Sequence, residues 1–261
     1  MLVGAAVCPH PPLLVPAVGA GTPAVEDVRA AAAAAVRALL ATRPEHVVVV
    51  GSGPGTASFG PDAWGSFAGY GVEAAAGLGP PEDRQGPPRL PLALAVGADL
   101  LARAGWRGEA SGLAVRSEAP SAEARELGSA LRRPARPTAL LVMGDGSVRR
   151  GNQGPGAFDE RAPSFDRKVT AALQAGDCSE LLALDAALAQ ELLVAGRAAW
   201  QVLAGAAAPH VAGWQRRVSY DGAPFGVGYV VATWLVPLTP PRVPQTAAGI
   251  EMPTPPRVSA P

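Results

Sequence analysis

The chain has 261 residues and a formal net charge of zero, with 48% hydrophobic and 17% charged residues. This length suffices for one large domain that folds without disulfides or a structural metal. The balanced charge argues against nucleic acid or anionic lipid as a partner. The two cysteines, Cys8 and Cys178, have no CxxC spacing, so we expect a cytoplasmic protein. No apolar run reaches the roughly 18 residues of a membrane-spanning helix, and we expect no membrane association.

The first fifty residues have the pattern of a strand, a helix and a second strand. An apolar run over 1–8 predicts a buried strand. A helix is expected over 22–44, with Thr22 as its cap and Pro23 at its first position. Four valines then predict a strand that runs into the turn GSGPGT, residues 51–56. This order is typical of parallel strands joined by a helical crossover.

Helical and strand patterns alternate along the rest of the chain. The proline- and glycine-rich stretch 79–90 predicts a surface loop. Further helices are expected over 91–106, 121–133, 162–177 and 179–207, and further strands over 112–117, 138–143 and 226–238. The chain therefore predicts a single α/β domain over 1–238, with a central, mostly parallel sheet flanked by helices. The proline-rich residues 239–261 predict a disordered tail.

The segment AAVCPHPPLLVP, residues 5–16, places His10 between prolines directly after the first predicted strand. Ligands of open α/β sheets usually bind outside the carboxyl ends of the strands. The prolines restrict the backbone, so His10 stands on a stiff platform suited to a metal ligand or a base. One histidine alone makes no metal site. The alternative is therefore a structural histidine in a turn, with backbone groups as its hydrogen-bond partners.

Two glycine-rich segments follow other predicted strands. GSGPGT contains Ser52; it lacks the lysine of a Walker A loop, but its backbone N–H groups can hold an anion. The segment 144–156 contains Asp145, a residue type that serves as cation ligand or general base, and Ser147. It continues with further polar residues, of which the arginines suit a carboxylate or phosphate: Arg149, Arg150, Asn152 and Gln153. The alternatives are a plain strand-to-helix turn and a solvated surface loop.

The remaining polar candidates have simpler interpretations. Tyr220 and Asp221 precede the last predicted strand, where the tripeptide YDG favours a turn. His46 opens a buried strand and His210 follows a proline in a loop, so we interpret both as structural. Cys8 lies on the first strand and is expected to be inert packing.

Four segments taken together resemble a known family. They are AAVCPHPPLLVP, VVVVGSGPGTASFGP, LLVMGDGSVRRGNQGPGAFDERAPSFD and YDGAPFGVGYVVATW. In this order they look like the actinobacterial proteins classed with the catalytic subunits of class III extradiol ring-cleavage dioxygenases. The resemblance covers about residues 1–236 and implies a class III extradiol dioxygenase-like α/β domain.

The resemblance also implies a metal site. In these enzymes two histidines and one glutamate hold Fe(II), with open positions for catechol and O₂, and a further histidine serves as acid and base. His10 matches the first iron histidine. Ser52 lies in the turn where the second iron histidine is expected. Asp145 and Ser147 lie where the acid/base histidine is expected. No glutamate matches the third ligand, and Asp221 is only a carboxylate nearby in the sequence.

Three hypotheses follow. The first is a diverged Fe(II)-dependent dioxygenase that opens a catecholic ring, with His10 as metal ligand and catalytic residue and Asp145 as second ligand or base. Ser52, Ser147, Tyr220 and Asp221 would then contact the substrate. The alternative is a non-catalytic protein that keeps the fold without the iron and binds a small, catechol-like molecule or a partner. A third is a metal-independent hydrolase that uses Ser52 or Ser147. A homo-oligomer is compatible with all three.

Overall fold

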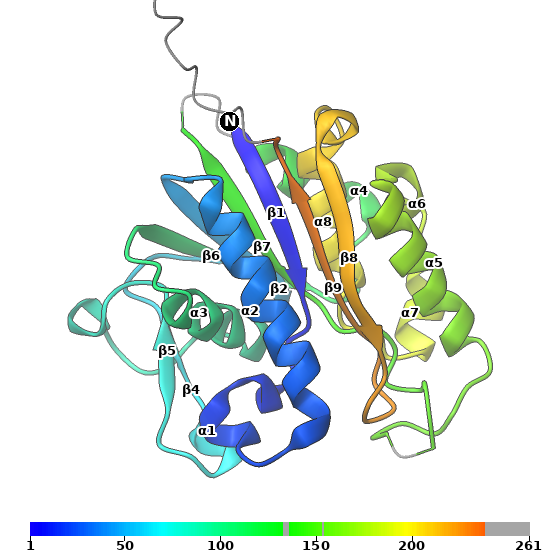
Figure 1. The fold of residues 1–261 in the computed structure, drawn as a ribbon, viewed down its shortest axis with the longest axis horizontal. Helices are drawn as coiled ribbons and strands as arrows, with labels where there is room; N and C mark the ends of the chain where they lie inside the picture. The colour runs from blue at the N-terminus through cyan, green and yellow to red at the C-terminus, as the bar shows by residue number, and fades with distance from the viewer. Residues whose placement is uncertain (133–135, 153, 238–261) are drawn as a thin grey trace, which may run out of the picture.

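The structure is a computed structural model, which describes residues 1–132, 136–152 and 154–237, and it forms one α/β domain (Figure 1). The main sheet has seven strands in the order β3-β6-β2-β7-β1-β9-β8. Its strands are β1 (Leu2–Cys8), β2 (His46–Gly53), β3 (Ala57–Phe59), β6 (Glu109–Arg116), β7 (Thr138–Met143), β8 (Gln215–Gly222) and β9 (Tyr229–Leu235). A second, two-stranded sheet consists of β4 (Trp64–Ser66) and β5 (Ala75–Gly77).

The four central strands of the main sheet run parallel. Strand β7 pairs in parallel with both β1 and β2, and β2 pairs in parallel with β6. Strands β3, β9 and β8 add antiparallel pairs at the two sides. The sheet is therefore mixed, and the expected parallel arrangement describes its centre. The valines of 47–50 are all buried, as continuous apolar runs of central parallel strands are.

Helices cover both faces of the sheet (Figure 1). Their bounds are α1 (Pro16–Gly19), α2 (Glu26–Ala41), α3 (Leu92–Arg103), α4 (Ser121–Ala130), α5 (Ala162–Ala175), α6 (Cys178–Leu182), α7 (Ala186–Glu191) and α8 (Arg197–Ala207). Helices α2 and α3 pack on one face, called here the α2 face, and α4 to α8 pack on the other, called the α8 face. A separate hydrophobic cluster fills each interface.

Two helix predictions need correction. Thr22 does not cap the first long helix: Pro23 begins a single 3-10 turn, and α2 starts at Glu26. The helix predicted over 179–207 is three helices, α6, α7 and α8. The Asp185 side chain accepts hydrogen bonds from backbone N–H groups at the start of α7, and Leu193 has a left-handed φ of 54° that stops it. Local capping here overrides the helical periodicity.

The turn expected at Tyr220 and Asp221 is also wrong, because both residues lie inside strand β8. Strand β8 forms an antiparallel hairpin with β9 and is the last strand of the sheet. Its register shifts between Val218 and Tyr220, and the Val218 N–H donates instead to the Gln174 side chain of α5 at 2.9 Å. Half-buried and exposed residues alternate along β8, as expected for a strand with one face toward the core.

The small elements between β2 and α3, including β3, β4 and β5, have no counterpart in the predictions. The predicted tail over 239–261 lies outside the described residues. Within the described ranges, no helix combines the length and the apolar character needed to cross a bilayer.

Candidate functional site at the carboxyl ends of β1 and β7

His10 lies directly beyond the carboxyl end of β1. The parallel pairing of β1 and β7 aligns Cys8 with Met143, so the residues that follow the two strands emerge side by side. The backbone N–H of His10 donates to Asp145 Oδ1 at 2.7 Å, and only 7% of His10 is exposed. The two residues predicted as the catalytic pair are therefore in direct contact.

The side chains of this pair have unused hydrogen-bonding capacity. His10 Nδ1 lies 3.6 Å from Asp145 Oδ1, which is too far for a direct hydrogen bond. Nδ1 is buried and has no hydrogen-bond partner among the described residues. Asp145 is held by the single backbone N–H of His10. A small shift of either side chain, or a bound hydroxyl group, would complete these bonds.

Burial dominates the electrostatics around Asp145. Loss of solvent raises the pKa of the Asp145 carboxyl, and the nearby His10 side chain and backbone N–H offset part of that rise. Burial also raises the pKa of the Tyr229 phenol, and the charges of Asp145 and Tyr220 add to it. Tyr229 and Tyr220 both pack against the α2-face cluster. Asp145 thus interacts with the Tyr229 phenol, which sequence reasoning did not single out, and Tyr220 lies next to Tyr229.

The loop after His10 is fixed by arginines from two helices. Arg29 of α2 donates from Nη2 to Leu13 O at 2.8 Å and from Nε to Leu14 O at 3.3 Å. Arg103 of α3 reaches Leu14 O at 3.4 Å. These bonds add to the restriction by the flanking prolines, so the backbone that carries His10 is held firmly in place.

Ser147 belongs to a different network, around Asp166 of α5. The Asp166 carboxylate accepts from the Ser147 backbone N–H at 3.0 Å and forms an ion pair with Arg150 at 2.9 Å. The Ser147 hydroxyl donates to Leu192 O at 2.8 Å and accepts from the Arg149 N–H at 3.0 Å. Arg150, predicted to be available for an anionic ligand, is therefore engaged by Asp166. Gln153 lies outside the described residues.

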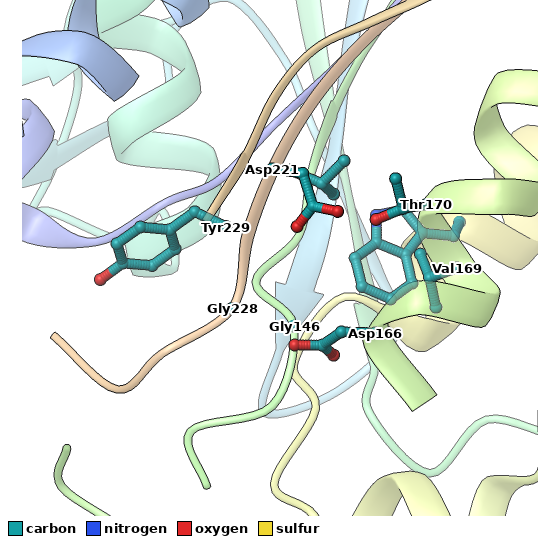
Figure 2. A pocket seen from close by; sticks show the side chains of 9 residues that line it. Gly146, Asp166, Val169, Thr170, Asp221, Gly228 and Tyr229 are labelled. Atoms are coloured by element: carbon teal, nitrogen blue, oxygen red, sulfur yellow. The ribbon is translucent and has the colours of Figure 1, made fainter. Parts of the chain in front are cut away.

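Two glycines let Asp166 approach the sheet. A Cβ at Gly228 would lie 1.9 Å from Asp166 Oδ2, and one at Gly146 would lie 2.8 Å from the same carboxylate. Asp166 and Trp200 line a cavity of about 10 Å³ on the α8 face (Figure 2), which is room for about one water molecule. Trp200 Nε1 is buried without a hydrogen-bond partner among the described residues.

Tyr220 and Asp221 face opposite sides of the sheet, as neighbours on a strand do. Asp221 lines the small cavity. Burial raises the pKa of Asp166, and the charge of Asp221 adds a smaller rise. Figure 2 shows the Tyr229 ring on the other side of its strand from Asp221 and Asp166. The sequence-based expectation of one shared pocket is therefore wrong for Asp221 and Ser147, which lie with Asp166 and not with His10.

Ser52 also lies apart from His10. It is the penultimate residue of β2 and lies on the same side as Val48 and Val50, which pack in the α8-face cluster. No histidine, aspartate or lysine side chain among the described residues hydrogen-bonds to the hydroxyl of Ser52, and both partners of the Ser147 hydroxyl are backbone groups. A serine nucleophile needs a base within hydrogen-bonding reach, so the hydrolase hypothesis has no support in this geometry.

The other histidines and the cysteines agree with structural roles. His46 is buried at the amino end of β2 with Nε2 3.0 Å from Ser111 Oγ, while His210 is exposed. Both cysteine thiols are free, and burial raises the pKa of Cys8 to about 12 and of Cys178 to about 11. Such thiols stay protonated and unreactive near neutral pH.

The donor set at His10 does not match the iron site that the resemblance implies. That site needs three protein ligands around one metal. Across 1–132, 136–152 and 154–237, no three His, Cys, Asp or Glu side chains are grouped so that they could hold a metal ion. His10 and Asp145 provide two donors, and His10 Nδ1 faces the carboxylate itself.

Asp166 is the main residue that sequence reasoning missed. It occupies the buried stripe of α5 together with Phe165, Val169 and Leu173. A carboxylate on the apolar face of an amphipathic helix is a signal visible in the sequence, since a buried charge is retained where it has a partner.

Comparison with known proteins bears on the fold. No protein-family model matches the chain, and no curated protein matches it. Among solved structures, the uncharacterized protein JW3007 from Escherichia coli K12 is similar, with a TM-score of 0.52 and 14% sequence identity. The similarity covers 89% of this chain and 99% of that one. At this identity the match establishes a shared α/β fold.

Proposed function

We propose that the protein is an iron-free relative of the class III extradiol dioxygenases that binds a small, hydroxyl-bearing molecule at His10 and Asp145. The family motifs and the α/β domain support the relationship. The paired but incompletely bonded side chains of His10 and Asp145 carry the functional proposal. A catechol-like ligand has the matching chemistry.

The position of the pair suits ligand binding. His10 and Asp145 follow adjacent parallel strands, and ligands of open α/β sheets bind at this end. The carboxylate can accept a hydrogen bond from a ligand hydroxyl, and the imidazole can donate or accept one. Because the loop after His10 is anchored by Arg29, little backbone ordering opposes binding.

The donor set argues against ring cleavage through iron. The two donors present do not complete the three-ligand arrangement of a non-haem Fe(II) oxygenase. We therefore assign His10 and Asp145 to hydrogen bonding and proton exchange with the ligand. A cytoplasmic location remains part of this proposal, supported by the free thiols of Cys8 and Cys178.

The test uses the small number of histidines. The chain has three, so ¹⁵N-labelled protein gives three sets of imidazole signals in an NMR spectrum. Titration of metal-free protein with catechol is expected to shift the His10 signals in a saturable manner. The variants His10→Ala and Asp145→Asn should lose this binding, and His210→Asn, at an exposed position, should keep it.

Two results would overturn the proposal. One is an unchanged His10 signal throughout the catechol titration. The other comes from anaerobic reconstitution with Fe(II): stoichiometric iron that His10→Ala fails to retain, together with catechol-dependent oxygen uptake. That second outcome would instead establish the dioxygenase hypothesis with a metal site formed on ligand binding.

A further inference from the structure

We propose a second binding site, for a small aromatic or aliphatic carboxylate, in the groove between β5, α3 and the turn at Trp106. The groove has a volume of about 460 Å³, which lies in the range of small-molecule sites. Trp106 and Gly108 directly precede β6, so this part of the groove lies near the amino end of that strand. His10 and Asp145 lie beyond the carboxyl ends of their strands, and the groove is a separate site.

Two side chains in the wall have hydrogen-bond donors without acceptors. Trp106 Nε1 and Arg84 Nε are both shielded from water, and neither has a partner among the described residues. Arginine and tryptophan side chains donate and do not accept. An unpaired, buried N–H group costs free energy, so the group that is missing from this wall is an acceptor.

The charges of the groove favour an anionic acceptor. Within the described residues the Arg84 guanidinium has no ion pair, and the Arg107 side chain donates to the neighbouring Trp106 carbonyl. Two acidic residues also line the groove. The Asp99 carboxylate is neutralised by Arg103 at 2.8 Å, and Glu82 is exposed.

The rest of the lining accommodates an apolar body. Leu78, Ala98 and Leu101 contribute apolar side chains beside the half-buried Trp106 ring. A ligand with a carboxylate next to Arg84 and a flat or aliphatic group next to the Trp106 ring would contact both the charged and the apolar part of the groove. A carboxylate accepts two parallel hydrogen bonds from a guanidinium, so Arg84 is the residue that we expect to bind it.

The test follows the indole N–H signal of Trp106 in ¹⁵N-labelled full-length protein. Five tryptophans give five such signals, and Trp106→Phe identifies the relevant one. Titration with benzoate is expected to shift it in a saturable way without moving the His10 imidazole signals. Arg84→Gln should weaken benzoate binding about tenfold, and Arg167→Gln, an exposed arginine on α5, should leave it unchanged.

Benzyl alcohol is the matched neutral probe. It keeps the aromatic ring and lacks the charge, so it is expected to bind much more weakly than benzoate. The proposal is overturned if benzoate leaves the Trp106 signal in place, if Arg84→Gln binds as well as the wild type, or if benzyl alcohol binds equally well. None of these results depends on His10, so the groove and the His10 site are tested separately.

Discussion

Asp145 and Asp166 are two carboxylates withdrawn from water at the same end of the sheet, and burial raises the pKa of both. Their partners differ. Asp166 has a permanent cation, Arg150, and a backbone N–H from Ser147. Asp145 has one backbone N–H and a histidine at 3.6 Å. Asp166, with a cation and a backbone donor, links α5 to the loop after β7, whereas only Asp145 has the incomplete set of partners on which the proposed ligand site rests.

The contrast also separates two parts of one loop. The segment after β7 contains Asp145, which accepts from the His10 N–H. It continues with Ser147, which is bonded to Asp166 of α5 and to Leu192 O on the α8 face. The Asp166 network fixes the path of the loop. The Asp166 network thus holds in place the loop that carries Asp145.

The largest expected effect is at Asp166. Asp166→Ala leaves Arg150 without its counter-charge and the Ser147 N–H without an acceptor, so we expect a loss of about 3 kcal/mol in the free energy of unfolding. Asp145→Ala removes one hydrogen bond to a backbone donor and should cost about 1 kcal/mol. Urea unfolding of both variants measures the difference. Equal losses of stability would contradict the inference that Asp166 contributes more to the fold than Asp145 does.

The close approach of Asp166 to the sheet gives a second test. Gly228→Ala places a methyl group 1.9 Å from Asp166 Oδ2, and the resulting displacement should cost about 2 kcal/mol. Gly55→Ala is the matched control, because no atom lies within 4 Å of its added Cβ. Thermal unfolding should show a lower midpoint for Gly228→Ala alone. An unchanged midpoint would mean that Asp166 moves aside freely.

The two serines of the hydrolase hypothesis should differ in their contribution to stability. Ser147→Ala removes a buried hydroxyl that donates to Leu192 O and accepts from Arg149 N, at a cost of about 1.5 kcal/mol. Ser52→Ala should change stability by less than about 0.5 kcal/mol, since it is only half-buried. Chemical denaturation of the two serine variants tests whether Ser147 belongs to the structural network around Asp166. A larger loss at Ser52 would contradict it.

The smallest effect concerns pH. Because burial raises the pKa of Asp145, the folded protein keeps this proton over a pH range in which the unfolded chain has lost it. Stability therefore falls as pH rises from the unfolded pKa of about 3.9 through the folded pKa, and is level above it. Asp145→Asn has no such proton.

The stability of Asp145→Asn relative to the wild type should thus improve between about pH 4 and about pH 7. Urea unfolding of the two proteins at both pH values gives the comparison. A relative stability that instead declines with rising pH would show that ionised Asp145 is stabilised in the fold by more than its burial costs.

Sequence patterns predicted the parts of the fold that repeat over many residues. The apolar runs of β1, β2 and β7 and the helices α2, α3, α4 and α5 lie close to their expected positions. Features decided by one or two residues were missed, such as the breaks between α6, α7 and α8 and the strand at Tyr220 and Asp221. The breaks depend on local capping by Asp185, a single residue that the helical periodicity outweighed. The strand depends on pairing with β9, a tertiary contact that leaves little trace in local composition.

The candidate site was predicted in part for a similar reason. His10 and Asp145 could be paired because each follows a strong strand pattern and parallel strands end at the same edge. Ser147 and Asp221 could not be placed correctly. Ser147 lies in a loop whose path depends on the distant Asp166, and for Asp221 the face to which a residue points changes with each step along a strand. An error of one residue in a predicted strand position therefore assigns a side chain to the wrong face of the sheet.

The two outer strands have a consequence for contacts between molecules. Strand β3 has only three residues, and β8 has Arg216 and Arg217 next to the register shift where Gln174 takes up a backbone N–H. Short length, adjacent positive charges and an irregular backbone are features that discourage the addition of a foreign strand. The outer strands of this sheet therefore have features that oppose edge-to-edge pairing of two copies.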